Sequence, residues 1–376
     1  MAACAGRSGS AGARIAVFRA LMLGDLLCAV PAMRALRAAH PGATLTLIGL
    51  PWAQALVDRL GCLDELMPFP GYPGLPETPP DTGALPGFLA AAQARKFDLV
   101  IQMHGSGILT NPLVASLGAR RLAGFCQPGA YCPERQRFIA WPEHRHEIER
   151  CLALTDALGV PRQGLHLEFP LRPEDHRRLQ GLWPQRGPRY AVVHPGSQLP
   201  SRRWPVERFA RVAEGLAREG LQIVVSGTAG EAGLAAALRR ICPAPVIDLT
   251  GRTDLWSLGA LLEGARLLVS NDTGVSHIAA ALGTPSVVVA SGGDARRWAP
   301  LERERHRVLW HDLPCRPCAH AVCPTGHECA LAIGAEAVLA TALELLHRHE
   351  GPSPCPTRPS ACASSPGTCT ATTSTT

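Results

Sequence analysis

Short apolar segments alternate with segments of helical length along most of this 376-residue chain. The alternation is clearest in two blocks, residues 14–158 and 189–290, which a proline-rich stretch separates. Strands that alternate with helices favour right-handed crossovers and a mostly parallel sheet. The sequence therefore predicts an α/β protein with two doubly wound, Rossmann-like domains that face a central cleft.

Composition suggests where the domains begin and end. We expect an N-terminal domain over residues 13–165, a linker over 166–188 and a C-terminal domain over 189–349. The linker prediction rests on the prolines between residues 161 and 188 and on weak periodicity there. Residues 350–376 are rich in Ser, Thr, Pro and Cys, which is typical of a disordered low-complexity tail.

The net charge of +6 is mild. It suits an anionic partner such as a phosphorylated glycolipid, a nucleotide or a membrane surface, and it also fits a simple compositional excess of arginine. No nucleic-acid motif is present, so we expect no nucleic-acid partner.

Every apolar run is shorter than the roughly 20 residues of a membrane-spanning helix. Arg19 and Asp25 interrupt the N-terminal apolar run, so this run makes a poor signal peptide. We expect a cytoplasmic protein, with peripheral contact at the inner membrane as a further option.

The strongest local motif is the segment 270–277, Ser-Asn-Asp-Thr-Gly-Val-Ser-His, between an apolar strand and an Ala-rich helix. Asp272 or Thr273 is a natural N-cap, and Gly274 leaves room for a ligand beside the backbone. A helix start of this kind attracts anions, and His277 lies one turn further on. An ordinary capped helix with a core histidine explains the same residues.

Two further loops follow predicted strands in the second half. Residues 194–197 (His-Pro-Gly-Ser) lead into Arg202 and Arg203, and guanidinium groups suit the oxygens of a diphosphate. Glu231 follows a Gly-Thr-Ala-Gly loop and could accept hydrogen bonds from ribose hydroxyls. The simpler interpretation of the arginine loop is a solvated surface loop. For Glu231 it is an acidic residue that the helix dipole favours in a first helical turn.

In the first half, Asp25 lies at a helix start directly after the first predicted strand. A carboxylate there could act as a general base on an acceptor hydroxyl, or it could simply cap the helix. No Gly-x-Gly-x-x-Gly follows this strand, and no Gly-x-x-x-x-Gly-Lys-Ser/Thr is present. These absences argue against the usual NAD or FAD fold and against a P-loop NTPase.

Together these motifs resemble glycosyltransferase family 9, typified by the lipopolysaccharide heptosyltransferases. The matching stretches are residues 19–36, 194–209, 227–234 and 250–291, and the Asp-Thr-Gly-x-x-His-x-x-Ala-Ala element is the most specific. The resemblance implies a GT-B fold, an ADP-sugar donor (usually ADP-heptose) held by the C-terminal domain, and a lipopolysaccharide-core or other envelope glycan acceptor. It also implies inverting transfer that needs no metal or other cofactor.

The same resemblance assigns roles to residues. Asp25 corresponds to the catalytic base. Donor-binding roles are implied for Ser197, Arg202, Glu231, Thr253, Asp272, Thr273, Gly274 and His277. Arg202 stands where some family members carry Lys.

Four cysteines cluster near the C-terminus at Cys315, Cys318, Cys323 and Cys329. Their spacing is compact enough for one structural zinc ion. Free thiols and disulfides are the alternatives, although disulfides are rare in the cytosol.

Two other functions compete with the glycosyltransferase. One is a non-catalytic relative that binds a nucleotide or glycan, and the other is a nucleotide-sugar epimerase of the GT-B type. A preference for UDP over ADP would favour the epimerase.

Overall fold

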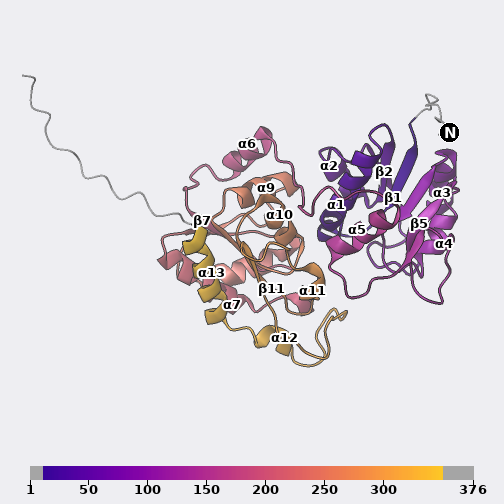
Figure 1. Cartoon of the computed structure of the whole chain (residues 1–376). Coiled ribbons are helices and arrows are strands. Elements are labelled where there is room, and N and C mark those ends of the chain that lie inside the picture. Colours follow the sequence, from indigo (N-terminus) through magenta and orange to yellow (C-terminus); the bar gives the residue numbers. More distant parts are fainter. Residues whose placement is uncertain (1–11, 350–376) are drawn as a thin grey trace, which may run out of the picture.

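The computed structural model describes residues 12–349, and these form two six-stranded sheets, one in each half of the chain (Figure 1). All ten strand pairings among the described residues are parallel. The predicted tail at 350–376 lies outside the described residues. Among the described helices, none is long and apolar enough to cross a membrane.

The N-terminal sheet has the strand order β3-β2-β1-β4-β5-β6. Its strands are β1 (Arg14–Phe18), β2 (Thr44–Gly49), β3 (Glu65–Pro68), β4 (Leu99–Gln102), β5 (Leu122–Cys126) and β6 (Phe138–Ala140). Its helices are α1 (Leu23–Ala39), η1 (Pro51–Ala53), α2 (Gln54–Val57), α3 (Leu85–Ala94), α4 (Thr110–Ala115) and α5 (Glu147–Ala157).

The C-terminal sheet has the order β12-β11-β10-β7-β8-β9. Its strands are β7 (Tyr190–His194), β8 (Gln222–Val225), β9 (Val246–Asp248), β10 (Leu267–Asn271), β11 (Ser286–Val289) and β12 (His306–Leu309). The helices of this half are α6 (Pro173–Leu182), η2 (Pro200–Arg202), α7 (Val206–Arg218), η3 (Ala229–Glu231), α8 (Ala232–Ile241), α9 (Leu255–Glu263), α10 (Gly274–Leu282), α11 (Ala295–Trp298), α12 (Glu328–Leu331) and α13 (Ala335–His349).

Both sheets follow the same doubly wound plan. Counted within each half, both have the order 3-2-1-4-5-6, with the chain reversing direction across the sheet between strands 1 and 4. In such sheets the binding crevice lies beyond the carboxyl ends of the strands at this switch point. The loops that follow β1 and β4, and those that follow β7 and β10, are therefore the places to look for a site.

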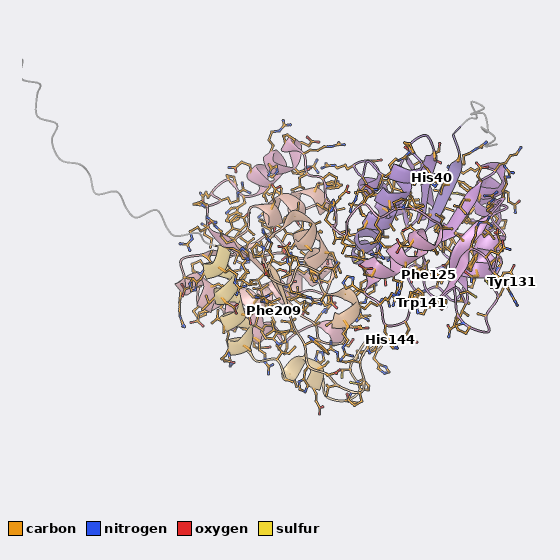
Figure 2. The ribbon with its side chains drawn as sticks, in the orientation of Figure 1. His40, Phe125, Tyr131, Trp141, His144 and Phe209 are labelled. Carbon is orange, nitrogen blue, oxygen red and sulfur yellow. The ribbon has the colours of Figure 1, made fainter. Side chains whose placement is uncertain are left out.

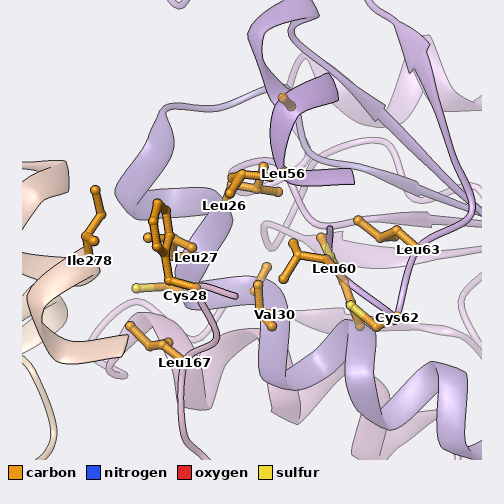
Figure 3. Packing of buried hydrophobic residues seen from close by; sticks show 14 of the residues in the cluster. Leu26, Leu27, Cys28, Val30, Leu56, Leu60, Cys62, Leu63, Leu167 and Ile278 are labelled. Atoms are coloured by element: carbon orange, nitrogen blue, oxygen red, sulfur yellow. The ribbon is translucent and has the colours of Figure 1, made fainter. Parts of the chain in front are cut away.

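The two halves meet through helices α1 and α10. Figure 3 shows Leu27 and Cys28 of α1 beside Ile278 of α10, and all three side chains are fully buried in one apolar cluster. Burial of each large aliphatic side chain contributes about 1.5–3 kcal/mol. The expected cleft is thus bridged along this line by direct helix-to-helix packing, which we call the domain junction.

The segment predicted as a linker contains helix α6, which packs against α9 of the C-terminal half. Asp175 of α6 pairs with Arg59, whose guanidinium lies 3.8 Å from the ring centroid of Trp256. This segment is therefore ordered by packing, and the exact domain boundaries stay a prediction.

Candidate functional site

The loop after β7 is tied to the loop after β10 by one buried side chain. Nδ2 of Asn271, the last residue of β10, donates to the carbonyls of Pro195 (2.8 Å) and Gly196 (3.2 Å). Its Oδ1 accepts from the backbone N–H of Trp204 at 2.9 Å. The Asn271 amide therefore brings Ser197 and the arginine loop next to the start of α10, as expected for a switch-point site.

Helix α10 begins at Gly274, and the Thr273 side chain makes no capping hydrogen bond to it. The neighbouring Asp272 is half-buried, and this burial raises its pKa to about 6, although the charges of Arg202 and Arg316 oppose that rise. Arg202 also donates from Nη2 to the carbonyl of Cys318 (3.2 Å), while its buried Nε has no protein partner. Two guanidinium groups and a helix N-terminus thus gather at one place, which suits an anionic ligand.

Glu231 reaches the same group of loops. Its Oε2 accepts hydrogen bonds from the backbone N–H and hydroxyl of Thr228, at 2.7 and 3.0 Å. Its carboxylate lies so close to Gly196 that any side chain at Gly196 would overlap it. Thr253 lies half-buried between β9 and α9, in a loop held to Gly227 by the Gly251 N–H (2.8 Å). Ser197, Glu231 and Thr253 therefore border one region.

Asp25 lies in the first turn of α1, on the opposite side of the domain junction. Burial raises its pKa, and the charge of Arg19 opposes the rise. Arg19 holds this turn in place, because its Nε donates to the Asp25 carbonyl at 2.8 Å. Asp25 is close enough to Asp272 of the other domain that the repulsion between the two carboxylates helps to raise the pKa of Asp272.

His277 lies at the domain junction. Its Nδ1 is 3.6 Å from Cys28 Sγ, and its ring packs on Gly24 of α1. Burial lowers the His277 pKa to about 4, so the ring is neutral near pH 7. Gly274 also faces α1: a Cβ there would lie 3.1 Å from Leu23. These two residues of the motif therefore contact the N-terminal domain.

Sequence reasoning missed four charged residues around this region: Arg19, Glu147, Arg297 and Arg316. Glu147 opens α5 and reads as an ordinary first-turn acid, and the other three are arginines in a chain rich in arginine. Arg19, Glu147 and Arg297 are distinguished only by ion pairs that join segments more than 100 residues apart. Arg316 is distinguished only by its charge near Asp272.

The four clustered cysteines do not form the predicted zinc site. All four are free, from exposed Cys315 to buried Cys329. Across residues 12–349, no group of three or more His, Cys, Asp or Glu side chains is arranged to hold a metal ion. Two local hydrogen bonds hold parts of this segment: Cys318 N–H donates to the Gly292 carbonyl (2.8 Å), and Cys323 Sγ accepts from His327 N–H (3.1 Å). Of the three alternatives, the structure agrees with free thiols.

Two doubly wound domains that meet through loops at their switch points define the GT-B class of glycosyltransferases. A match to glycosyltransferase family 9 (heptosyltransferase) covers residues 89–328. The chain belongs to this family and is a glycosyltransferase.

Lipopolysaccharide heptosyltransferase 2 of Salmonella typhimurium is 27% identical over 325 residues, which cover 79% of this chain and 87% of that relative. Two solved structures have the same fold. A family 9 glycosyl transferase of Veillonella parvula superposes with a TM-score of 0.75 at 23% identity, covering 89% of this chain and 98% of the other. The ADP-heptose lipopolysaccharide heptosyltransferase II of E. coli gives 0.71 at 21% identity, covering 90% and 100%.

Proposed function

We propose that this protein transfers heptose, or a closely related sugar, from an ADP-sugar to a lipopolysaccharide core or another envelope glycan. Family membership and the heptosyltransferase relatives support this donor and acceptor class. The single observation that carries the proposal is the anion site at the start of α10, which lies across the domain junction from the carboxylate of Asp25.

Donor binding uses the C-terminal loops. The diphosphate lies at the N-terminus of α10, against Thr273 and Gly274, with Ser197 and Arg202 beside it. The unpartnered Nε of Arg202 gives the phosphate oxygens a ready donor. Glu231 accepts from the ribose hydroxyls, and the Thr253 loop meets the adenine. Asp272 faces the transferred sugar, while His277 supports the site from the junction.

Transfer proceeds in one inverting step. The acceptor hydroxyl oxygen forms a bond to the anomeric carbon while the bond from that carbon to the diphosphate oxygen breaks. Asp25 takes the hydroxyl proton on the face opposite the leaving group. Negative charge develops on the departing ADP, and Arg202 and the helix N-terminus stabilise it without a metal ion. The reacting carbon resembles an oxocarbenium ion, as in glycoside hydrolysis.

The first test is calorimetric titration with ADP, UDP, GDP and CMP, each with and without EDTA. Selection of ADP that EDTA does not weaken supports the metal-independent ADP-sugar transferase. Turnover of ADP-heptose that falls by about 10²–10⁴-fold in Asp25→Asn, with ADP binding retained, then completes the case. Selection of UDP would overturn the donor and favour an epimerase, and binding of no nucleotide would favour a non-catalytic relative.

We also propose that the protein works at the inner face of the membrane, where a lipid-linked acceptor is found. Exposed apolar side chains Ile108, Leu109 and Tyr131 lie on the loops that follow β4 and β5, and exposed Arg135 lies on the loop that follows β5. Figure 2 shows Tyr131 at the edge of the N-terminal domain away from the C-terminal domain. Aromatic and basic side chains together are typical of interfacial binding. Flotation with anionic vesicles should carry the protein, and Tyr131→Ser should weaken it where Val322→Ser, exposed on the other domain, does not.

A further inference from the structure

A buried carboxylate, Glu147, binds three arginines at once. Its Oε1 accepts from Arg19 Nη2 at 2.9 Å. Its Oε2 accepts from Arg150 Nη1 at 2.5 Å and from Arg297 Nε at 2.8 Å. Arg19, Arg150 and Glu147 are each at most 2% exposed, so they are shielded from water, whereas the Arg297 side chain is 29% exposed. Burial alone would raise the Glu147 pKa, but the charges of Arg19, Arg297 and Arg150 outweigh it and lower the pKa to about 2.

One member of the cluster comes from the other domain. Glu147, Arg19 and Arg150 belong to the N-terminal half, whereas Arg297 lies on α11 of the C-terminal half. The Arg297 guanidinium lies 5.9 Å from the Trp141 ring centroid of the N-terminal half. The neighbouring His146 Nε2 is 2.8 Å from the Ala299 carbonyl, so the same two segments also meet through a second polar contact. The ion pair between Glu147 and Arg297 therefore exists only while the two domains are together.

The cluster also touches the proposed base. Arg19 connects Glu147 to the first turn of α1, because its Nε donates to the Asp25 carbonyl and its Nη1 donates to the Met103 carbonyl at 2.5 Å. Arg19 and Arg297 favour the charged form of the Asp25 carboxylate, and Glu147 opposes it. Other titratable groups at the junction are Asp272, His277 and the thiols of Cys28 and Cys151.

We infer that Glu147 and Arg297 form an interdomain latch that makes the base Asp25 fully competent only when the domains close. Both are positioning residues, and the inference rests on the proposed role of Asp25. When the domains separate, Arg297 withdraws and the Asp25 carboxylate no longer faces the donor loops. Within the closed arrangement, Arg297 supplies one attractive charge to Asp25 and partly neutralises the repulsion from Glu147, so loss of the Arg297 charge alone makes protonation of Asp25 easier.

The test compares Arg297→Gln with Arg296→Gln. Arg296 is the neighbouring residue of α11, but its side chain is 71% exposed and pairs with Asp312, away from the cluster. Arg297→Gln should lower kcat roughly tenfold near neutral pH, as expected for loss of one partly exposed charged hydrogen bond. The acidic limb of its kcat/KM profile should shift to higher pH. Arg297→Lys keeps the positive charge, so the acidic limb of its profile should lie close to that of the unaltered protein. Arg296→Gln should match the unaltered protein.

Two measurements separate the latch from a merely structural effect. Small-angle scattering with ADP bound should show a more open Arg297→Gln protein, and melting should show that it remains folded. Equal kcat, pH profile and scattering for the two variants would overturn the latch, as would a fall in kcat with neither a shift of the acidic limb nor a difference in scattering. Should Asp25 not be the base, the scattering difference would persist while the pH shift vanished, so the two failures are distinguishable. Glu147→Gln is less suitable, because it leaves Arg19 and Arg150 buried without a counter-charge.

Discussion

Replacement of Gly24 by alanine should hold the two domains apart. Gly24 lies in the first turn of α1, and a Cβ there would be 2.5 Å from His277 Cδ2 and 3.0 Å from its Nε2. The histidine has little room to withdraw, because it is 5% exposed and its Nδ1 is already 3.6 Å from Cys28 Sγ. The contact crosses the domain junction, so separation of α1 from α10 relieves it without any change inside either domain.

The size of the effect follows from the energetics of an overpacked contact. An extra methyl group in a well-packed site costs about 1–3 kcal/mol. At about 1.4 kcal/mol per factor of ten, the population of the closed arrangement falls by a factor of roughly 5–150. Alanine is a better helix former than glycine by up to about 1 kcal/mol, but that gain is equal in the open and closed arrangements. Thermal stability should therefore stay constant or rise slightly while activity falls.

The assay is steady-state turnover of ADP-heptose with a lipopolysaccharide-core acceptor. For Gly24→Ala, kcat/KM should fall by the same factor of roughly 5–150 if only the closed arrangement reacts. Gly233→Ala is the matched control, since it lies inside helix α8 and its added methyl would meet nothing within 4 Å. A Gly24→Ala protein whose kcat/KM stays within about twofold of the Gly233→Ala protein would refute the assignment of this contact to closure.

Three more outcomes can be measured directly. Asp25→Asn should lower kcat by about 10²–10⁴-fold and leave the calorimetric Kd for ADP unchanged; because burial raises the Asp25 pKa, kcat/KM of the unaltered protein should fall as the pH is lowered through that raised value. Gly196→Ala should displace the Glu231 carboxylate and weaken ADP binding by roughly 5–150-fold, with a normal melting temperature. The folded-state pKa of Glu147, about 2 against an ordinary 4.5, means that its contribution to stability is complete above pH 4.5 and is lost as the pH falls from there towards 2, which urea unfolding at several pH values should show.

The sequence predicts the central strands and the short edge strand β9, but it gives no signal for β3, β5, β6 or β12. Central strands contain apolar runs, Ile-Ala-Val-Phe in β1 and Leu-Leu-Val in β10, because helices cover both faces of a parallel sheet. The edge strands β3 and β6 have only four and three residues, and β5 (Leu-Ala-Gly-Phe-Cys) has no β-branched residue. Short or propensity-poor segments become strands because a neighbouring strand is already in place, and no local pattern records that.

The residues of the candidate site were likewise only partly predictable from the sequence. Asp25, Asp272 and Glu231 were found because each polar side chain follows an apolar strand and precedes a helix, and the switch-point rule brings such loops together. Arg297 and Glu147 escaped because their importance lies in a contact across 150 residues of sequence. His277 lies in the predicted 270–277 motif, but its ring packs against the N-terminal domain. That contact depends on how the two domains meet, and the sequence of helix α10 alone does not reveal it.

The sequence predicts a possible zinc site in the cysteine-rich segment, but in the structure it is the backbone of this segment that supports the proposed donor site. Ser201 N–H donates to the Ala321 carbonyl (3.0 Å), and the Ser201 hydroxyl donates to the His320 carbonyl (2.5 Å). His327 Nε2 lies 2.7 Å from the Ser201 carbonyl. These contacts fix the turn that carries Arg202, whose Nη2 is held by the Cys318 carbonyl. The spacing of the cysteines suggested their sulfur atoms as the functional groups, whereas main-chain groups of this segment make the contacts that orient Arg202, the arginine proposed to bind phosphate.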